Sequence, residues 1–119
     1  MGTVHKERNK KPMTTEEFIQ SIENTYRDGV ALVRRKNKDY ANSENPFRNF
    51  EFSSLVGVSP ERAILVRIAD KLARIANLLD KDASVKEEAI TDSILDDINY
   101  LAILKALLES KRHLKKSGK

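Results

Sequence analysis

The stretch that decides the fold is SPERAILVRIADKLARIANLLD, residues 59–80. Ser59 is a good N-cap residue, and Pro60 suits the first position of a helix. Seven apolar side chains gather on one side of the helical wheel: Ile64, Leu65, Ile68, Leu72, Ile75, Ala76 and Leu79. The stretch therefore predicts an amphipathic helix that begins at Pro60 and ends near Asp80.

Two further helices are predicted on either side of it. The sequence TTEE at 14–17 has the form of a capping box and predicts a helix over about 15–38. The apolar residues of this helix form one stripe: Phe18, Ile22, Tyr26, Val30 and Val33. The sequence SVKE at 84–87 is a second capping box and predicts a helix to about residue 112.

These elements indicate one all-α domain. The connection between the second and third helices is only three residues (81–83), so the two should be antiparallel neighbours. Four Gly and three Pro in 119 residues argue against a turn-rich β architecture. We predict an antiparallel bundle of three long helices within a single domain, residues 13–110.

The third helix has apolar residues on two opposite sides. One side resembles an ordinary core stripe: Ile90, Ile94, Leu101, Leu104 and Leu108. The other side carries Val85, Leu95, Ala102, Ile103 and Ala106. A helix that is apolar on two sides is usually buried on both. The second side should meet the first helix, a symmetry mate or both, so we predict a homo-oligomer, by default a dimer, that completes the bundle.

Three carboxylates run along that second side, Glu88, Asp92 and Asp96, with Asn99 beside them. Carboxylate oxygens bind hard cations such as Mg²⁺, so these three are candidate metal ligands. The alternative is a solvated acidic edge paired with Lys and Arg. Like charges at i, i+4 destabilise a helix unless a cation or a basic partner balances them.

The second helix carries a mixed basic and acidic stripe. Arg67, Asp70, Arg74 and Asn77 lie within one face, away from the Ile/Leu stripe, and Lys71 flanks them. Paired Arg forks suit a phosphate or a carboxylate. Alternatively, the arginines pair with Asp70 and with the acids of the third helix, and both arrangements could hold together.

The connection 37–58 contains four of the seven aromatic residues: Tyr40, Phe47, Phe50 and Phe52. It is long for a loop, and its aromatic rings indicate an ordered, packed segment. We expect Phe50 and Phe52 to form a small core that caps the bundle. Tyr40, beside Lys38 and Asp39, is the better candidate for contact with a ligand. Asn42, Ser43 and Asn45 could hydrogen-bond a ligand or shape turns.

The net charge of +4 is unevenly distributed. Residues 1–12 carry +3 and residues 110–119 carry +5, so residues 13–109 carry −4. We expect 1–12 and 111–119 to be basic, flexible tails. Such tails give nonspecific, salt-sensitive binding at most, so nucleic acid is not the expected partner. Without cysteine, an apolar span or a secretory signal, the chain is expected in the cytoplasm and away from membranes.

Three motifs together resemble a known family. They are KDY (38–40) with NPF (45–47), RIADKLAR (67–74) with NLL (77–79), and Glu88, Asp92 and Asp96 with Tyr100. Over about residues 30–104 the chain resembles the phage and prophage family called nucleotide modification associated domain, type 1. This resemblance implies a role in phage nucleotide metabolism inside a bacterial host cell. It implies more about the fold than about a reaction.

The layout is also distantly similar to the all-α nucleotide pyrophosphohydrolases of the MazG and dimeric dUTPase group. Those enzymes hold Mg²⁺ with Glu and Asp of adjacent helices and typically carry an E-x-x-E helix before an E-x-x-D helix. In this chain the corresponding motif has Arg67, Asp70 and Arg74, of which only Asp70 is acidic. This departure favours binding of an anionic ligand over metal catalysis.

The leading hypothesis is a nucleotide-binding protein that holds its ligand between helices. It would sequester a nucleotide or cyclic nucleotide, such as an immune signal of the host, without turnover. The predicted ligand-binding residues are Lys38, Asp39, Tyr40, Arg67, Asp70, Lys71 and Arg74. The first alternative is a Mg²⁺-dependent pyrophosphohydrolase that uses Glu88, Asp92, Asp96 and Asp70. The second is nonspecific nucleic-acid binding through the basic tails.

Overall fold

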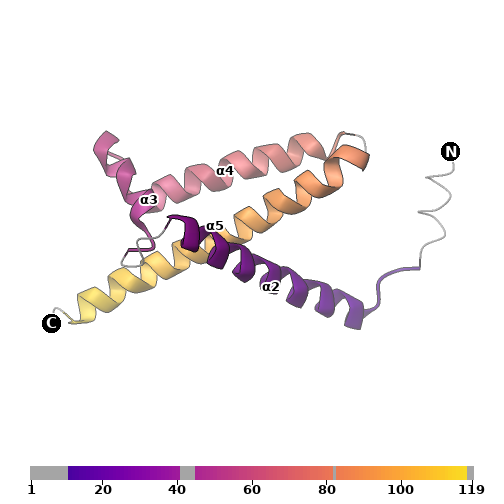
Figure 1. Cartoon of the computed structure of the whole chain (residues 1–119), viewed down its shortest axis with the longest axis horizontal. Coiled ribbons are helices and arrows are strands. Elements are labelled where there is room, and N and C mark those ends of the chain that lie inside the picture. The colour runs from indigo at the N-terminus through magenta and orange to yellow at the C-terminus, as the bar shows by residue number, and fades with distance from the viewer. Residues whose placement is uncertain (1–10, 41–44, 82, 118–119) are drawn as a thin grey trace.

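The structure is a computed structural model that describes residues 11–40, 45–81 and 83–117. Every regular element in these ranges is a helix: α2 (Thr15–Tyr40), α3 (Arg48–Glu51), the 3₁₀ helix η1 (Phe52–Val56), α4 (Pro60–Leu78) and α5 (Ala83–Ser117). The all-α prediction and its three long helices are confirmed (Figure 1). None of the described helices is long and apolar enough to cross a membrane.

The predicted caps position two of the long helices. The backbone N–H of Thr14 donates to Glu17 Oε1 at 2.9 Å, and the N–H of Glu17 donates to Thr14 Oγ1 at 3.1 Å. This reciprocal pair is the predicted capping box, and it satisfies two donors that a helix start leaves unpaired. Ser59 Oγ accepts from the N–H of Arg62 at 3.2 Å and caps α4 in the same way.

The ends of α4 and α5 differ slightly from the prediction. The helix α4 ends at Leu78, two residues before Asp80, and α5 continues to Ser117, five residues beyond Arg112. The two helices run antiparallel from a short connection, as predicted (Figure 1). The helix α5 begins at Ala83, so Ser84 lies within the helix and is not its N-cap, contrary to the predicted capping box at 84–87.

The connection before α4 is folded into short helices. Asn45 Oδ1 accepts from the N–H of Phe47 at 3.1 Å, and Asn45 Nδ2 donates to Glu51 Oε1 at 2.7 Å, which fixes the start of α3. The Ser53 hydroxyl lies 2.8 Å from the carbonyl oxygen of Phe50 and 2.7 Å from that of Val58. Gly57 ends η1 with φ +77°, a left-handed conformation that favours glycine.

The core sits where α3, the start of α4 and the second half of α5 meet. Its buried apolar residues are Phe50, Ile64, Ile68 and Leu107, and Phe47, Tyr100, Ile103 and Leu104 pack against them. Phe50 is thus a core residue, as predicted. The prediction for Phe52 was wrong, because this side chain is 55% exposed. Two helical steps turn it by about 200° away from Phe50.

The seam between α4 and α5 follows positions spaced alternately by four and three residues. On α4 these are Ile64, Ile68, Lys71, Ile75 and Leu78, and on α5 they are Ser93, Asp97, Tyr100, Leu104 and Leu107. All ten are buried or half-buried. We call them the inner stripes. Their spacing averages 3.5 residues, the repeat that keeps two packed helices in register.

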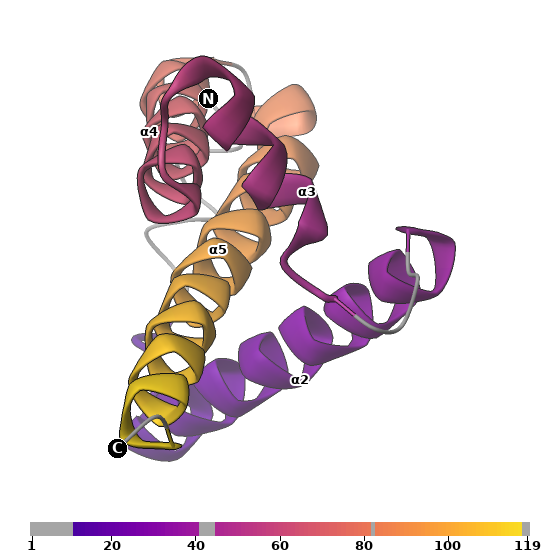
Figure 2. The same ribbon diagram turned by 90° about the vertical axis from the view of Figure 1, so that its left-hand side faces the viewer.

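The helix α2 packs against α5 and crosses it at an angle (Figure 2). At the crossing, a Cβ on Gly29 would lie 2.9 Å from Asn99 Oδ1, so a larger residue there would require the Asn99 side chain to move. The second side of α5 therefore meets the first helix, one of the two partners expected. Because α2 touches α5 over only part of its length, most of its apolar stripe is exposed, against expectation: Phe18, Ile22, Tyr26 and Val30.

The predicted core stripe of α5 is only partly buried. Ile90 and Leu104 are half-buried, whereas Ile94, Leu101 and Leu108 are exposed. Each of these three follows a residue of the inner stripe by one position. One helical step of 100° is enough to turn a side chain away from the seam.

Candidate functional site

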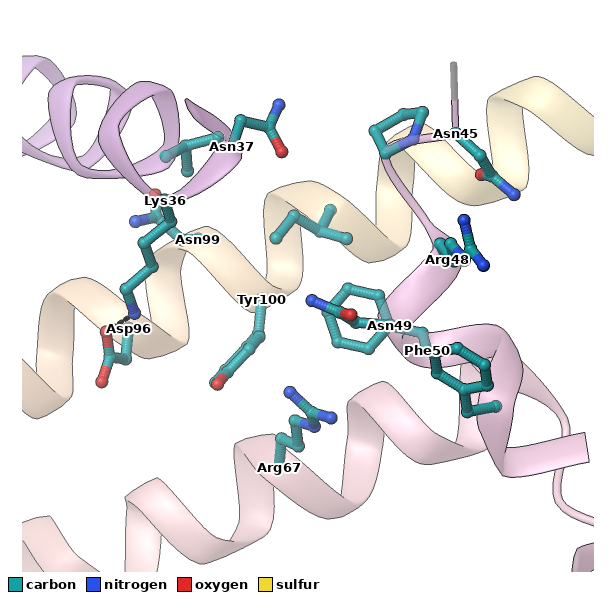
Figure 3. A pocket seen from close by; sticks show the side chains of 14 residues that line it. Lys36, Asn37, Asn45, Arg48, Asn49, Phe50, Arg67, Asp96, Asn99 and Tyr100 are labelled. Atoms are coloured by element: carbon teal, nitrogen blue, oxygen red, sulfur yellow. Dashed lines mark hydrogen bonds and ion pairs between the residues drawn. The ribbon is translucent and has the colours of Figure 1, made fainter. Parts of the chain in front are cut away.

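A cavity of about 530 Å³ opens between α2, α3, α4 and α5 (Figure 3). Fourteen residues line it: Val33, Lys36, Asn37, Asn45, Pro46, Arg48, Asn49, Phe50, Phe52, Arg67, Asp96, Asn99, Tyr100 and Ile103. Its size falls within the range of small-molecule sites. The lining combines three basic side chains, one acid, four amides and three aromatic rings.

The register of α4 and α5 explains why their polar residues meet here. Arg67 precedes the inner-stripe residue Ile68 by one position, and Asp96 precedes Asp97 in the same way. Because the helices are antiparallel, one step back along either chain turns a side chain to the same side of the pair. The predicted basic stripe of α4 and the acidic row of α5 thus share one side, which is also the side that α2 crosses (Figure 2).

Two arginines of the cavity are held by aromatic rings. Arg67 Cζ lies 4.9 Å from the centroid of the Phe50 ring, and Arg48 Cζ lies 6.0 Å from that of Phe52. Such cation–π contacts fix a guanidinium without using its hydrogen-bond donors. Neither arginine forms an ion pair with an acid in the described ranges. Both forks therefore retain donors for an anion.

Among the described residues, Asp96 is the one acid that lines the cavity, and it is already paired. Lys71 Nζ lies 2.8 Å from Asp96 Oδ2, and Lys36 Nζ lies 3.5 Å from Asp96 Oδ1. The hydrogen bond to Asp96 raises the pKa of Lys71 more than burial lowers it, so Lys71 stays charged. Two lysines thus more than balance one carboxylate.

Amides and rings supply the neutral part of the lining. Asn37 comes from α2, Asn45 and Asn49 from the α3 segment and Asn99 from α5 (Figure 3). Each amide can both donate and accept, as the edge of a base or a sugar hydroxyl requires. Phe50 and Tyr100 meet edge to face, with centroids 6.3 Å apart, and the Tyr100 ring borders the cavity.

The sequence predicted part of this site. Arg67 and Asp96 line the cavity, and Lys71 reaches it through Asp96. Other predicted residues do not line it: Lys38, Asp70, Arg74, Glu88 and Asp92 are exposed elsewhere on the surface. The side chains of Asp39 and Tyr40 lie outside the described part of the chain.

The predicted metal site is not assembled in the described part of the chain, where no three His, Cys, Asp or Glu side chains gather as ligands. The spacing of Glu88, Asp92 and Asp96 placed them in one row. Of the three, only Asp96 lines the cavity. The Mg²⁺ site stays a prediction, while the alternative of basic partners holds for Asp96, which pairs with Lys36 and Lys71.

Sequence reasoning missed Lys36, Arg48 and three of the four cavity amides as site residues. A signal was present: residues 37–49 contain four asparagines, an unusual density, together with Arg48. Asn45 stood out as a residue able to bind a ligand or to shape a turn. The structure gives it the second task through its bonds to Phe47 and Glu51, while its side chain also borders the cavity.

Comparisons with protein-family models, with curated proteins and with solved structures find no match. The family resemblance of the motifs therefore stays a prediction. The site is interpreted from its own geometry.

Proposed function

We propose that this protein binds a small phosphorylated ligand of the nucleotide class in the cavity between α2, α3, α4 and α5, and holds it without turnover. One observation carries the proposal. Arg48 and Arg67 border the same cavity, each fixed by an aromatic ring and each without a carboxylate partner in the described ranges. Positioned guanidinium forks with unused donors are suited to phosphate oxygens.

The roles of the lining residues follow from their chemistry. Arg48 and Arg67 bind phosphate oxygens, and Lys36 adds positive charge from α2. Asn49 and Asn99 offer donors and acceptors to a base or a sugar, and Tyr100 offers a ring edge and a hydroxyl. The cavity of about 530 Å³ accommodates a ligand of nucleotide size.

Retention without turnover is preferred over hydrolysis because of Asp96. A metal-dependent pyrophosphohydrolase needs carboxylates that are available to a cation. The one cavity carboxylate is instead engaged by Lys36 and Lys71. Sequestration of a nucleotide signal is the use that best suits such a site.

The test is a binding assay with matched variants. Purified protein is titrated with a panel of nucleoside mono-, di- and triphosphates and cyclic nucleotides, and bound ligand is recovered by denaturation and identified. Arg67→Ala should weaken binding by roughly tenfold to a hundredfold, since a hydrogen bond to a charged group contributes about 1.5–3 kcal/mol. Arg74→Ala is the control, because it removes the same side chain from the same helix outside the cavity.

Each alternative has its own outcome. Intact ligand recovered after incubation with Mg²⁺ supports retention, and released pyrophosphate supports the hydrolase. Equal losses in Arg67→Ala and Arg74→Ala would indicate a diffuse charge effect and contradict the cavity. Binding of DNA but of no nucleotide would contradict the proposal altogether.

A further inference from the structure

Both long antiparallel helices carry a second stripe beside the inner one. Moving each inner-stripe position forward by one residue gives Leu65, Ala69, Leu72, Ala76 and Leu79 on α4, and Ile94, Ile98, Leu101, Lys105 and Leu108 on α5. We call these the outer stripes. Nine of the ten residues are apolar, and both stripes keep the alternating spacing of four and three that packed helices use.

The two outer stripes lie on one side of the α4–α5 pair. In an antiparallel pair, one step forward along either chain turns a side chain to the same side, opposite to the side reached by one step back. The backward step leads to the cavity and to α2. The contacts of the described elements put α2 against α5 only, and the remaining contacts of α4 are with α3 and η1 (Figure 2).

The surface formed by the outer stripes is apolar and exposed. Leu65, Leu72, Ile94, Leu101 and Leu108 are each between 39 and 56% exposed. Their combined exposure exceeds that of two fully exposed leucines. The alanines between the leucines of α4 leave room for a close helix approach. Lys105, the single charged member, is paired with Glu109 at 2.7 Å, and its aliphatic stem can cover apolar surface.

We propose that this surface binds the same surface of a second copy of the chain, so that two α4–α5 pairs form a four-helix bundle. In such a bundle each helix packs on two neighbours and needs two stripes about one helical step apart. Both helices have this arrangement. The inner stripes pack against each other within one chain, and the outer stripes are available for a second pair of helices. The occupant must therefore be an antiparallel pair of helices with two apolar stripes of matching spacing and length, which is what a second copy offers, face to face about a twofold axis.

The test measures the mass in solution by sedimentation equilibrium, with substitutions of matched exposure. The wild-type chain should have twice the 13.5 kDa mass of one chain. Leu72→Glu and Leu101→Glu should weaken self-association by roughly a hundredfold or more, since each would bury an unpaired charge in the interface. Val66→Glu is the control, because Val66 is on α4, is 57% exposed against 56% for Leu72, and lies off both stripes.

The folded protomer should survive these changes, since each side chain is exposed within one copy, and far-UV circular dichroism checks this. A monomeric wild-type chain would overturn the proposal. So would a dimer that withstands Leu72→Glu and is broken by Tyr26→Glu on α2 instead.

Cross-linking gives a second readout that does not depend on a charged substitution. The chain has no cysteine, so Leu72→Cys and Leu101→Cys can be oxidised singly and as a mixture. If like helices of the two copies face each other, each single-cysteine variant should form a disulfide-linked dimer with itself. If α4 of one copy faces α5 of the other, the mixture should form the cross-linked dimer. Absence of cross-linked dimer in all three would contradict this surface.

Discussion

Asp97 offers the sharpest test of the packing between α4 and α5. It lies on the inner stripe of α5, is 7% exposed, and has both carboxylate oxygens buried without a hydrogen-bond partner in the described structure. Burial raises the pKa of Asp97, and the neighbouring charge of Asp96 raises it further. The native environment therefore disfavours the ionised form of Asp97, so ionisation of this group reduces the stability of the fold.

Asp97→Asn removes the charge and preserves the shape. A buried polar group without a partner costs about 1–3 kcal/mol, and a charged one costs more. The introduced amide is still a buried polar group. The variant therefore recovers only the difference in free energy between burying a carboxylate and burying an amide. We expect the variant to be more stable than the wild type by about 1–2 kcal/mol at pH 8, which corresponds to a rise in Tm of about 4 °C per kcal/mol for a chain of this size.

The gain should depend on pH in a definite direction. An unfolded aspartate titrates near its ordinary value, 3.8, and the native pKa is higher. Between the two values the native state binds more protons than the unfolded state, so wild-type stability falls as pH rises through the native pKa and then levels off. The amide of the Asp97→Asn variant does not titrate, so position 97 adds no pH dependence to the stability of the variant. The advantage of the variant should thus be small near pH 4 and full at pH 8.

Urea denaturation at pH 4 and pH 8 measures both free energies, at one fixed protein concentration because self-association would add to the stability. Asp92→Asn is the control, since it removes an exposed carboxylate from the same helix and should change stability by less than about 0.5 kcal/mol. A loss of stability at pH 8 in Asp97→Asn, or a gain that is the same at both pH values, would refute the reasoning. The loss would mean that the carboxylate has a partner, and the equal gain would mean that its pKa is not raised in the native state.

Two further predictions concern contacts between distant parts of the chain. Gly29→Leu should destabilise the protein by about 1–3 kcal/mol in a thermal melt, because its side chain would collide with Asn99 where α2 crosses α5; an unchanged Tm would contradict that crossing. Lys111→Met should raise the pKa of Glu61, which a hydrogen bond from Lys111 lowers, as followed by NMR titration. The wild type should lose more stability than this variant as pH falls below about 4.5, and equal acid sensitivity would show that the pair is not formed.

The long helices were predictable because their signals are local. Ser59 and the Thr14–Glu17 box act within one helical turn, and the Ile/Leu spacing of α4 reports its own buried face. The apolar spacing of α4 could not show which of its residues belong to the inner stripe and which to the outer stripe. Leu72 and Ile75 both belong to the predicted apolar side of α4, and only the position of α5 decides that Ile75 is half-buried and Leu72 exposed.

The cavity was less predictable because it is assembled from four elements. Arg48 lies in a segment that sequence reasoning treated as a loop, and its relation to Arg67 depends on how α3 folds onto α4. Lys36 reaches Asp96 across sixty positions of sequence, a distance at which no spacing rule operates. The predicted ligand residues Asp70 and Arg74 share the correct face of α4, yet they lie beyond the part of that face which α3 and α2 enclose.

A step of one residue along each helix links the proposed ligand site to the proposed dimer surface. On α4, Arg67, Ile68 and Ala69 are consecutive, and they point in turn to the cavity, to the seam with α5 and to the outer surface. The corresponding triplet on α5 is Asp96, Asp97 and Ile98. A ligand bound at Arg67 and a second copy bound at the outer stripes would therefore meet opposite sides of one pair of helices. Each copy would keep an open cavity. Leu72→Glu should therefore weaken the dimer and leave one ligand bound per chain, whereas Arg67→Ala should weaken ligand binding and leave the dimer intact.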